Sequence, residues 1–254
     1  MSDLARRLLD EHAAGTRFSA LPGIANEAAA YVTQAAYVTL LCERDRTYVA
    51  GYKIGLTSKR MQEFCGIDHP IAGLVLKTRV HGSGARIRAS DYGRLGIEFE
   101  IAMRMGQDLP ARPRPYDLET VGAAVEAIAP GMELIDDRDA DYSALDPMSL
   151  VADNSWNAGI VLGEFRDKWP DLPGIGGRVF ENGMEVDKGT GADVLGHPLT
   201  ALHWLANHLA RQGGGLRRGD VVMTGSLVTT RFLKEGSFRF DLDGVGSVAL
   251  DVIP

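Results

Sequence analysis

The sequence predicts an α+β protein in which a helical N-terminal segment, residues 1–60, leads into a β-rich domain, residues 61–254, the two forming one structural unit. Helical spacing of apolar residues marks the first part, where Leu4, Leu8 and Leu9 share one face. Beyond residue 70, short alternating runs separated by turn residues are typical of strands. The 30 glycines among 254 residues suit many tight turns better than a bundle of long helices.

Two helices are expected in the N-terminal segment. The first covers residues 3–13, and the Leu-Pro-Gly-Ile stretch that follows breaks the chain direction. The second runs from residue 26 to residue 42, and helical order is expected to stop at the charged run that follows. Its apolar face consists of Tyr31, Ala35, Val38 and Leu41.

Near residue 50 the period changes from that of a helix to that of a strand. The alternating residues are Tyr52, Ile54 and Leu56 on one face and Gly51, Lys53 and Gly55 on the other. A third helix is expected directly afterwards, with Thr57 or Ser58 as its N-terminal cap and Gly66 at its end.

The remainder of the chain is predicted to be mostly β-structure. Strands are expected over residues 74–80, 96–105, 131–135, 160–162, 238–243 and 247–252, and helices over 118–128, 146–154 after a turn, and 199–212. Asn182-Gly183, between two alternating runs, predicts a hairpin with a type I′ turn.

Composition excludes several classes of partner. With 27 Lys and Arg against 34 Asp and Glu, the net charge is −7, which argues against nucleic acid and against an anionic membrane surface. Cys42 and Cys65 form neither a disulfide framework nor a metal-ligand pair. The N-terminus does not resemble a secretory or transit signal, and no apolar run approaches the roughly 20 residues that span a bilayer. We therefore expect a cytoplasmic protein.

The acids of two predicted strands are the most informative feature. Glu98 and Glu100 lie two residues apart and therefore on one face, roughly 7 Å from each other. Either this face meets solvent, or a hard cation such as Mg²⁺ or Mn²⁺ offsets the repulsion. Glu133 is the single charge in an apolar strand, and such a residue is rarely buried without a partner. Three acids in one place would require a metal or a proton.

Two further features are compatible with a small anionic ligand. Lys53 lies between Gly51 and Gly55, where the absence of side chains would let a ligand or another backbone approach; alternatively, the lysine reaches solvent. The strand ending in Gly225-Ser226 offers backbone N–H groups and a hydroxyl that could receive a carboxylate or enolate oxygen, or it forms an ordinary turn.

Together these segments resemble the hydratase/decarboxylase branch of the fumarylacetoacetate hydrolase superfamily, which includes 2-keto-4-pentenoate hydratases and 4-oxalocrotonate decarboxylases of aromatic-compound catabolism. The matching stretches are GYKIGLTSKRMQ at 51–62, IEFEIAMRMGQDL at 97–109, ELIDDR at 133–138, VADNSWNAGIVLG at 151–163 and GHPLTALHWLANHLARQGGGLRRGDVVMTGSL at 196–227. They occur in the right order and cover nearly the whole chain from about residue 25.

The resemblance implies a mixed β-roll core of the superfamily's C-terminal-domain type, preceded by helices. It also implies a divalent metal, usually Mg²⁺, held by Glu98, Glu100 and Glu133, with Lys53 as the active-site lysine. The hydrolase branch carries a His and a Glu soon after the strand of this lysine. Here that stretch reads GLTSKRMQEF, without His, which argues against hydrolysis of a C–C bond.

The implied function is a metal-dependent lyase that adds water to a 2-oxo or 2-hydroxy alkenoate of the 2-keto-4-pentenoate type. A decarboxylase of the 4-oxalocrotonate type and a catalytically silent accessory subunit are the alternatives. Gly225-Ser226 leans towards the hydratase, with Ser226 or a residue of the segment Asp153-Asn154-Ser155 as the candidate to orient water. A homo-oligomer is expected, as is association with a partner decarboxylase or hydratase.

One segment departs from the branch pattern. Where its members typically carry an acid in a Leu-Leu-Asp-Asp-Met-like stretch, this chain has Leu76-Lys77-Thr78-Arg79. Lys77 and its neighbours could bind a second carboxylate of a dicarboxylic substrate, or they lie exposed on a strand edge.

Overall fold

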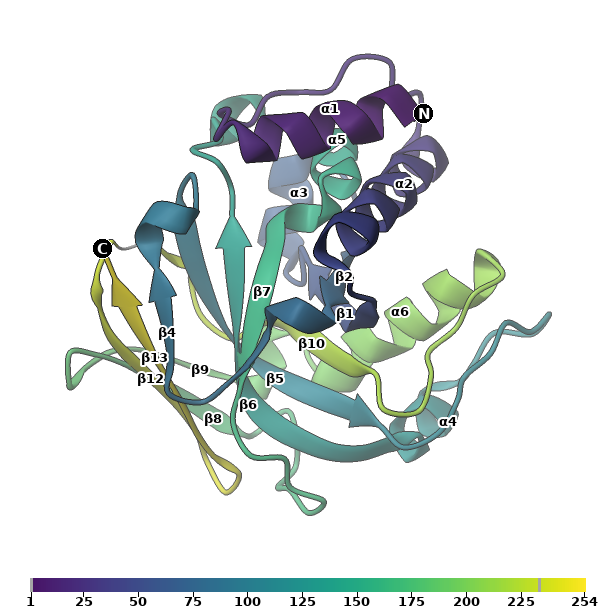
Figure 1. Ribbon diagram of the computed structural model, residues 1–254. Helices are drawn as coiled ribbons and strands as arrows, with labels where there is room; N and C mark the ends of the chain where they lie inside the picture. The colour runs from purple at the N-terminus through teal and green to yellow at the C-terminus, as the bar shows by residue number, and fades with distance from the viewer. Residues whose placement is uncertain (1, 233) are drawn as a thin grey trace.

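The computed structural model describes residues 2–232 and 234–254, and within them the strands form two sheets (Figure 1). The large sheet has the order β2-β1-β10-β5-β6-β7-β3, with β11 paired to β5, and the small sheet has the order β4-β13-β12-β8-β9. Both sheets mix parallel and antiparallel pairs. This is the mixed α+β architecture with N-terminal helices that the sequence predicts.

The bounds of the elements are as follows. The large sheet contains β1 (Val49–Gly55), β2 (Ile71–Leu76), β3 (Val80–Gly82), β5 (Leu95–Met105), β6 (Val125–Asp136), β7 (Asn157–Leu162), β10 (Val221–Ser226) and β11 (Arg231–Phe232). The small sheet contains β4 (Ala85–Arg88), β8 (Gly176–Glu181), β9 (Met184–Thr190), β12 (Gly236–Leu242) and β13 (Gly246–Ile253). The α-helices are α1 (Ser2–Ala13), α2 (Glu27–Asp45), α3 (Lys59–Cys65), α4 (Leu118–Ala123), α5 (Pro147–Ala152) and α6 (Pro198–Arg211). Short 3₁₀ turns are η1 (Lys77–Arg79), η2 (Ala89–Asp91), η3 (Tyr142–Ala144), η4 (Asn154–Trp156) and η5 (Gly191–Asp193).

Capping residues set the ends of α3 and α2, the helices on either side of β1 in the chain. Ser58, rather than Thr57, caps α3 by accepting a hydrogen bond from the backbone N–H of Met61, and Gly66 ends the helix in the left-handed region. The predicted end of α2 at residue 42 is wrong, because the helix continues to Asp45. Its last carbonyls are satisfied by the N–H of Arg46, which takes the left-handed conformation.

Strand pairing overrides the helical pattern in two places. The helix predicted over 118–128 stops at Ala123, and residues 125–136 form β6. β6 pairs with β5 along almost its full length, from Val125 opposite Met105 to Asp136 opposite Leu95, so ladder hydrogen bonds outweigh local helix propensity. The strand predicted over 74–80 ends at Leu76, and η1 follows it.

The N-terminal helices and the sheets share one core. β1 lies between antiparallel β2 and parallel β10, so the large sheet already includes residues 49–55. Phe18 and Tyr31, which come before the first strand, pack in the same apolar cluster as the strands. In Figure 1, α1, α2 and α5 lie together on one side of the large sheet, and a second apolar cluster joins them to Leu76.

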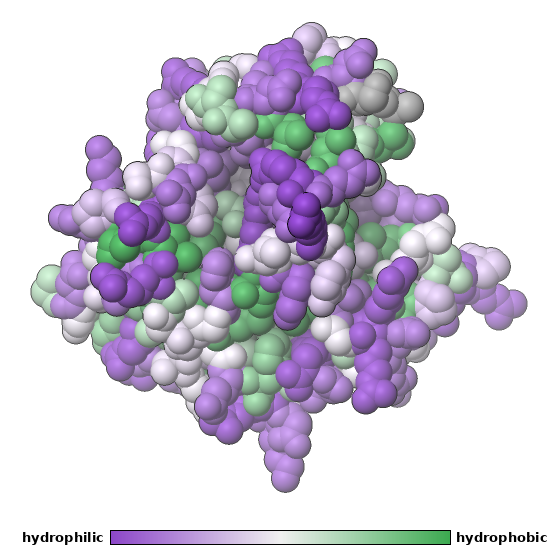
Figure 2. All heavy atoms as spheres, in the orientation of Figure 1, coloured by the Kyte–Doolittle hydropathy of each residue, from purple (hydrophilic) through white to green (hydrophobic). Residues whose placement is uncertain are grey.

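Polar side chains cover most of the face shown in Figure 2, with apolar side chains gathered in small areas between them. In the described part of the chain, no helix combines the length and the apolar character needed to cross a membrane.

A buried amide fastens α2 to two other elements. Gln34 takes the inward position that the sequence pattern assigned to its neighbour Ala35, which is exposed. The Nε2 of Gln34 donates to the carbonyl oxygen of Ala72 on β2 at 2.8 Å and to that of Val151 on α5 at 2.7 Å. One side chain therefore connects α2 to the sheet and to α5.

Replacing this amide by an apolar group should destabilise the protein. Gln34→Leu leaves two buried carbonyl oxygens without this donor, so the free energy of unfolding should fall by about 1–3 kcal/mol. Thr39→Ala on the exposed side of α2 is the matched control and should change it by less than about 0.5 kcal/mol. Chemical denaturation measures both, and equal effects of the two substitutions would contradict the assigned role of Gln34.

Candidate active site

Three carboxylates converge on one face of the large sheet. Glu98 lies directly opposite Glu133 in the antiparallel pairing of β5 and β6, and Glu100 follows two residues along β5 on the same face. Each offers one oxygen to a group in which all ligand atoms lie within 4.8 Å of one another. Glu100 and Glu133 are fully buried and Glu98 is half-buried, so the face that carries Glu98 and Glu100 is not simply a solvent-facing strand.

A neutral donor holds one oxygen of each acid. The hydroxyl of Thr230 donates to Glu98 Oε1 at 2.7 Å, and the Nδ2 of Asn157 donates to Glu133 Oε1 at 2.8 Å. The backbone N–H of Gly225 donates to Glu100 Oε2 at 2.7 Å. Among the described residues, Glu100 Oε1 and Glu133 Oε2 are buried without a hydrogen bond. Glu100 Oε1 is therefore suited to a cation, as is Glu133 Oε2, which also lies 3.3 Å from Lys53 Nζ.

Lys53 supplies the positive charge at this cluster. Only 4% of the residue is exposed, so it does not reach solvent, and its Nζ lies 3.3 Å from Glu133 Oε2. Burial by itself would lower the pKa of Lys53, but the neighbouring Glu133, Glu98 and Glu100 outweigh burial and raise the pKa above its ordinary value. The lysine is therefore charged at neutral pH.

The lysine does not balance three carboxylates. Burial is the main cause that raises the pKa of Glu133 from 4.5 to about 7, and it also raises the pKa of Glu100 well above the ordinary value, with Glu133 and Glu98 adding repulsion. Three carboxylates and one lysine leave a charge of −2 when all are ionised, which a divalent cation would neutralise. Hard oxygen donors of this kind fit Mg²⁺ or Mn²⁺.

Gly225 has a different role from the one that the sequence suggests. It does not line the cavity beside the cluster, and its N–H is engaged by Glu100. A Cβ at this position would lie 2.2 Å from Oγ1 of Thr57, and its φ of +111° favours glycine. Gly225 thus orients a candidate ligand of the metal, and a ligand-contacting role for it is not supported by this geometry.

A cavity of about 440 Å³ opens next to the carboxylates. At its polar end lie Lys53, Glu98, Ser155, Ser226 and Thr230. Apolar side chains from several elements form much of the remaining wall, among them Leu56, Ile71, Ile135, Leu145, Leu150 and Leu227. The cavity is large enough for a small organic acid, with one polar and one mainly apolar part.

Ser226 and Ser155 both line the cavity and are the candidates for the expected role of orienting water. Ser226 Oγ accepts a hydrogen bond from the N–H of Phe99 at 3.0 Å and retains access to the cavity. Ser155 Oγ donates to the carbonyl oxygen of Ala72 at 3.1 Å. Of the segment 153–155, only Ser155 reaches the cavity, because Asp153 is bound to buried Arg138.

The conformation of η4 places Ser155. Asn154, Ser155 and Trp156 all have positive φ angles, 51°, 50° and 60°, which cost energy in residues other than glycine. The Asn154 side chain holds this turn by accepting from the N–H of Leu74 and donating to its carbonyl oxygen. The turn directs Ser155 and Trp156 into the cavity wall.

Lys77 is not part of this cavity, contrary to the expectation from the sequence. It is exposed in η1, after β2 has passed the cavity wall at Ile71. Leu76 lies opposite Val49, four residues from Lys53 on β1, which corresponds to roughly 13 Å at 3.3 Å per residue. The strand therefore carries the basic segment away from the carboxylates.

Sequence reasoning missed the residues that orient the acids. Asn157 could have been suspected as a polar residue at the start of an apolar strand. Thr230 lies in a loop with no distinguishing pattern, and only the path of the chain brings it to Glu98. Arg60, Tyr142 and Asp193 also line the cavity without having been predicted.

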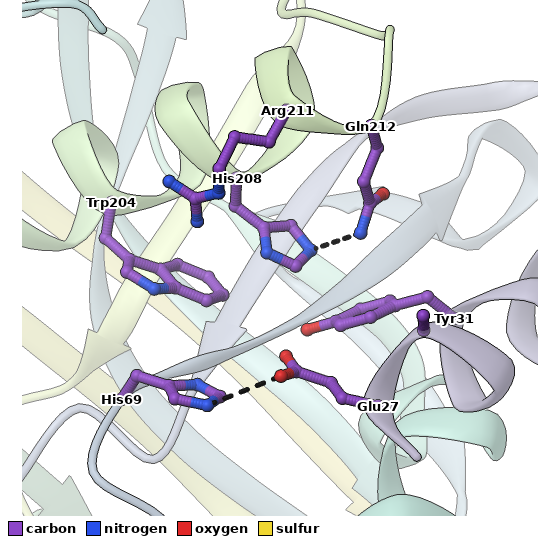
Figure 3. A pocket seen from close by; sticks show the side chains of 8 residues that line it. Glu27, Tyr31, His69, Trp204, His208, Arg211 and Gln212 are labelled. Carbon is purple, nitrogen blue, oxygen red and sulfur yellow. Dashed lines mark hydrogen bonds and ion pairs between the residues drawn. The ribbon is translucent and has the colours of Figure 1, made fainter. Parts of the chain in front are cut away.

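A second pocket between α2 and α6 is separate from the carboxylates (Figure 3). Its rings contact one another: the ring of Trp204 stacks on that of His208 with centroids 4.8 Å apart, and the ring of Tyr31 meets His208 at a tilt of 57°, with centroids 4.5 Å apart. Burial lowers the pKa of His208 to about 4, so this histidine is neutral, and Gln212 donates to its Nε2. We assign this ring cluster to the packing of α2 against α6.

Residues 27–253 match the family described as fumarylacetoacetate (FAA) hydrolase C-terminal, and the chain belongs to this family. It is 35% identical over 205 residues to a 2-keto-4-pentenoate hydratase of Burkholderia vietnamiensis, an alignment that covers 79% of this chain and 76% of that protein. It is 32% identical over 228 residues to a 2-oxo-hept-4-ene-1,7-dioate hydratase of Escherichia coli, covering 87% and 84%.

A solved structure extends the likeness to the whole fold. The 4-oxalocrotonate decarboxylase from Pseudomonas putida G7, complexed with magnesium and adipate, has a TM-score of 0.89 to this chain at 27% identity, covering 99% of this chain and 97% of that one. The mixed fold with N-terminal helices is therefore that of the family.

Magnesium should stabilise the protein more at about pH 8 than at about pH 5.5. Folding raises the pKa of Glu133 from 4.5 to about 7, so the protonated carboxyl stabilises the folded protein. This contribution is complete below pH 4.5 and is lost as the pH rises through 7. A divalent cation replaces the proton in the upper range. Melting temperatures with and without MgCl₂ across this interval measure the effect. Glu100→Gln should remove most of the magnesium-dependent shift, and a shift independent of pH would contradict the coupling.

Proposed function

We propose that this protein is a metal-dependent hydratase that adds water to a 2-oxo or 2-hydroxy alkenoate of the 2-keto-4-pentenoate type. The observation that carries the proposal is the convergence of Glu98, Glu100 and Glu133 beside buried Lys53 at the polar end of a cavity. Relatives named as hydratases at 32–35% identity support the same reaction class.

Glu98, Glu100 and Glu133 would hold the cation, which we propose to be Mg²⁺ or Mn²⁺. When bound, such an ion supplies Lewis-acid stabilisation of the negative charge that develops on a 2-oxo acid. The decarboxylase of similar fold is described as complexed with magnesium, which supports the proposal without identifying the ion here.

The residues of the chain supply orientation and proton transfer. The charged Nζ of Lys53 would bind the acid head of the substrate and move a proton at the enol oxygen or the adjacent carbon. Ser226 and Ser155 present hydroxyl groups to the cavity and would orient the water that adds to the conjugated double bond. The product is a 4-hydroxy-2-oxo acid. The apolar wall would hold the alkenyl chain away from bulk water.

A decarboxylase of the 4-oxalocrotonate type is the second candidate, because the solved structure of similar fold is such an enzyme. Its reaction passes through the same kind of enolate after loss of CO₂ and requires no oriented water. The hydroxyl groups of Ser155 and Ser226 at the polar end favour hydration. A silent accessory subunit is the least favoured, since it would have no reason to bury Glu100 and Glu133, each with one oxygen that lacks a hydrogen bond to any described residue.

We further propose a place for the enzyme in aromatic-compound catabolism, a cytoplasmic location and a homo-oligomeric state, with a partner decarboxylase or hydratase as a further possibility for assembly. The net charge of −7 argues against binding to nucleic acid or to an anionic membrane surface, both of which need a cationic face.

Removing the lysine charge should impair catalysis more than binding. Lys53→Met should lower kcat for a 2-hydroxydienoate by a factor on the order of 10²–10⁴, the usual range for a positioned proton-transfer group. Loss of the ultraviolet absorbance of the dienoate measures the rate. Lys188→Met, an exposed lysine on β9, is the matched control and should leave kcat unchanged. An unaltered kcat for Lys53→Met would exclude lysine-assisted hydration.

A diacid of the 2-hydroxymuconate type distinguishes the two reactions. Under hydratase chemistry the purified, magnesium-loaded protein should release no CO₂ from it while converting a 2-hydroxydienoate. Stoichiometric, magnesium-dependent release of CO₂ would replace the hydratase assignment by the decarboxylase.

A further inference from the structure

We propose that Arg60 makes the cavity selective for 2-oxo acids that carry a second carboxylate at the far end of the chain. The inference rests on the proposed function, because the first carboxylate and the 2-oxygen would occupy the polar end beside Lys53. It specifies the substrate class as a dicarboxylate and gives the selectivity to a residue of α3.

Two cationic side chains line the cavity, and they are not equivalent. Within residues 2–232 and 234–254, Lys53 and Arg60 are the basic residues of the wall. Lys53 is buried and already paired with Glu133. Arg60 is exposed, and the described residues give it neither an ion pair nor a side-chain hydrogen bond. Its guanidinium is therefore available to a ligand.

The same cavity is suited to an alkyl or alkenyl chain, because the apolar side chains of Leu56, Met61, Leu145, Leu150 and Leu227 line it together with Lys53 and Arg60. A terminal methyl group would gain nothing from the arginine at the wall. A terminal carboxylate would form charge-assisted hydrogen bonds with it, in the two-pronged geometry that guanidinium groups favour.

The backbone that carries Arg60 is fixed. The side chain of Ser58 caps α3, and buried Gln62, two residues after Arg60, donates to the carbonyl oxygen of Leu56 at 2.9 Å. The helix thus provides a rigid base while the long side chain can adjust to chain length. Asp193, an acid that also lines the cavity, accepts hydrogen bonds from the N–H and the hydroxyl of Thr190.

The basic segment at 77–79 does not perform this task. Lys77 lies outside the cavity, and Arg79 lies 3.9 Å from Asp45, on the side of α2. Recognition of a second carboxylate, which the sequence suggested for Lys77, is therefore assigned to Arg60 on α3.

Two saturated ligands of equal length test the proposal. 2-Oxoadipate and 2-oxohexanoate have six carbons and the same 2-oxo acid head, and they differ in a terminal carboxylate against a terminal methyl group. Isothermal titration calorimetry of the magnesium-loaded protein should give at least about tenfold tighter binding of 2-oxoadipate, the ratio expected for one charge-assisted interaction.

Arg60→Gln should abolish that preference by weakening the binding of 2-oxoadipate about tenfold, while the affinity for 2-oxohexanoate stays the same. Lys59→Gln, the exposed neighbour that does not line the cavity, is the matched control and should retain the preference. Equal affinities in the wild type, no binding of 2-oxoadipate, or a parallel loss for both ligands in Arg60→Gln would each overturn the proposal.

The outcome is separable from the test of the reaction. Neither ligand has a carbon–carbon double bond, so their binding does not depend on hydration. Retained hydration of a dienoate without ligand preference would refute the role of Arg60 alone. Preference without hydration or CO₂ release would refute the proposed reaction and leave the role of Arg60 in binding a diacid intact.

Discussion

Electrostatic repulsion among three neighbouring carboxylates, two of them fully buried, is the constraint on which the rest of the site depends. Two like charges about 4 Å apart repel by roughly 4 kcal/mol at an intermediate dielectric, so Glu98, Glu100 and Glu133 cannot remain ionised without compensation. Lys53 provides one positive charge, and hydrogen bonds from Thr230, Asn157 and Gly225 fix one oxygen of each acid. The residual deficit is the physical reason why the site favours a divalent cation.

Glycines allow close packing on the face of the large sheet that carries the acids and Lys53. Gly131, opposite Glu100 on β6, leaves room for Met223, since a Cβ there would lie 2.8 Å from its Cε. Gly51 lets β10 approach β1, because a Cβ would lie 1.9 Å from the carbonyl oxygen of Val221. Gly51 therefore lets another backbone approach, as anticipated for this pattern, whereas Gly55 lines the cavity. The close strands keep the lysine within reach of Glu133.

Different residues of the cavity would have different functions. The acids and Lys53 would act on the reacting head of the substrate, while apolar side chains and Arg60 would determine which tail is accepted. One relative is named for a monocarboxylate substrate and another for a dicarboxylate, at 35% and 32% identity to this chain. Overall sequence identity therefore does not indicate which substrate tail this protein accepts. A single side chain on α3 offers a physical basis for that choice, which the fold alone does not provide.

The sequence by itself determined the features that depend on neighbours in the chain. The two-residue spacing put Glu98 and Glu100 on one face, Gly66 marked the end of α3 and Thr57 or Ser58 its start, and the Asn182-Gly183 turn joined β8 to β9. Only the tertiary structure decided that Glu133 faces Glu98, that Thr230 holds this acid, and that Arg60 rather than Lys77 lines the cavity. It also turned residues 125–128 from a predicted helix into a strand. These outcomes depend on strand register and loop paths, which are set by contacts between residues far apart in the sequence. Local periodicity cannot predict them, because it reflects only residues that are close together in the chain.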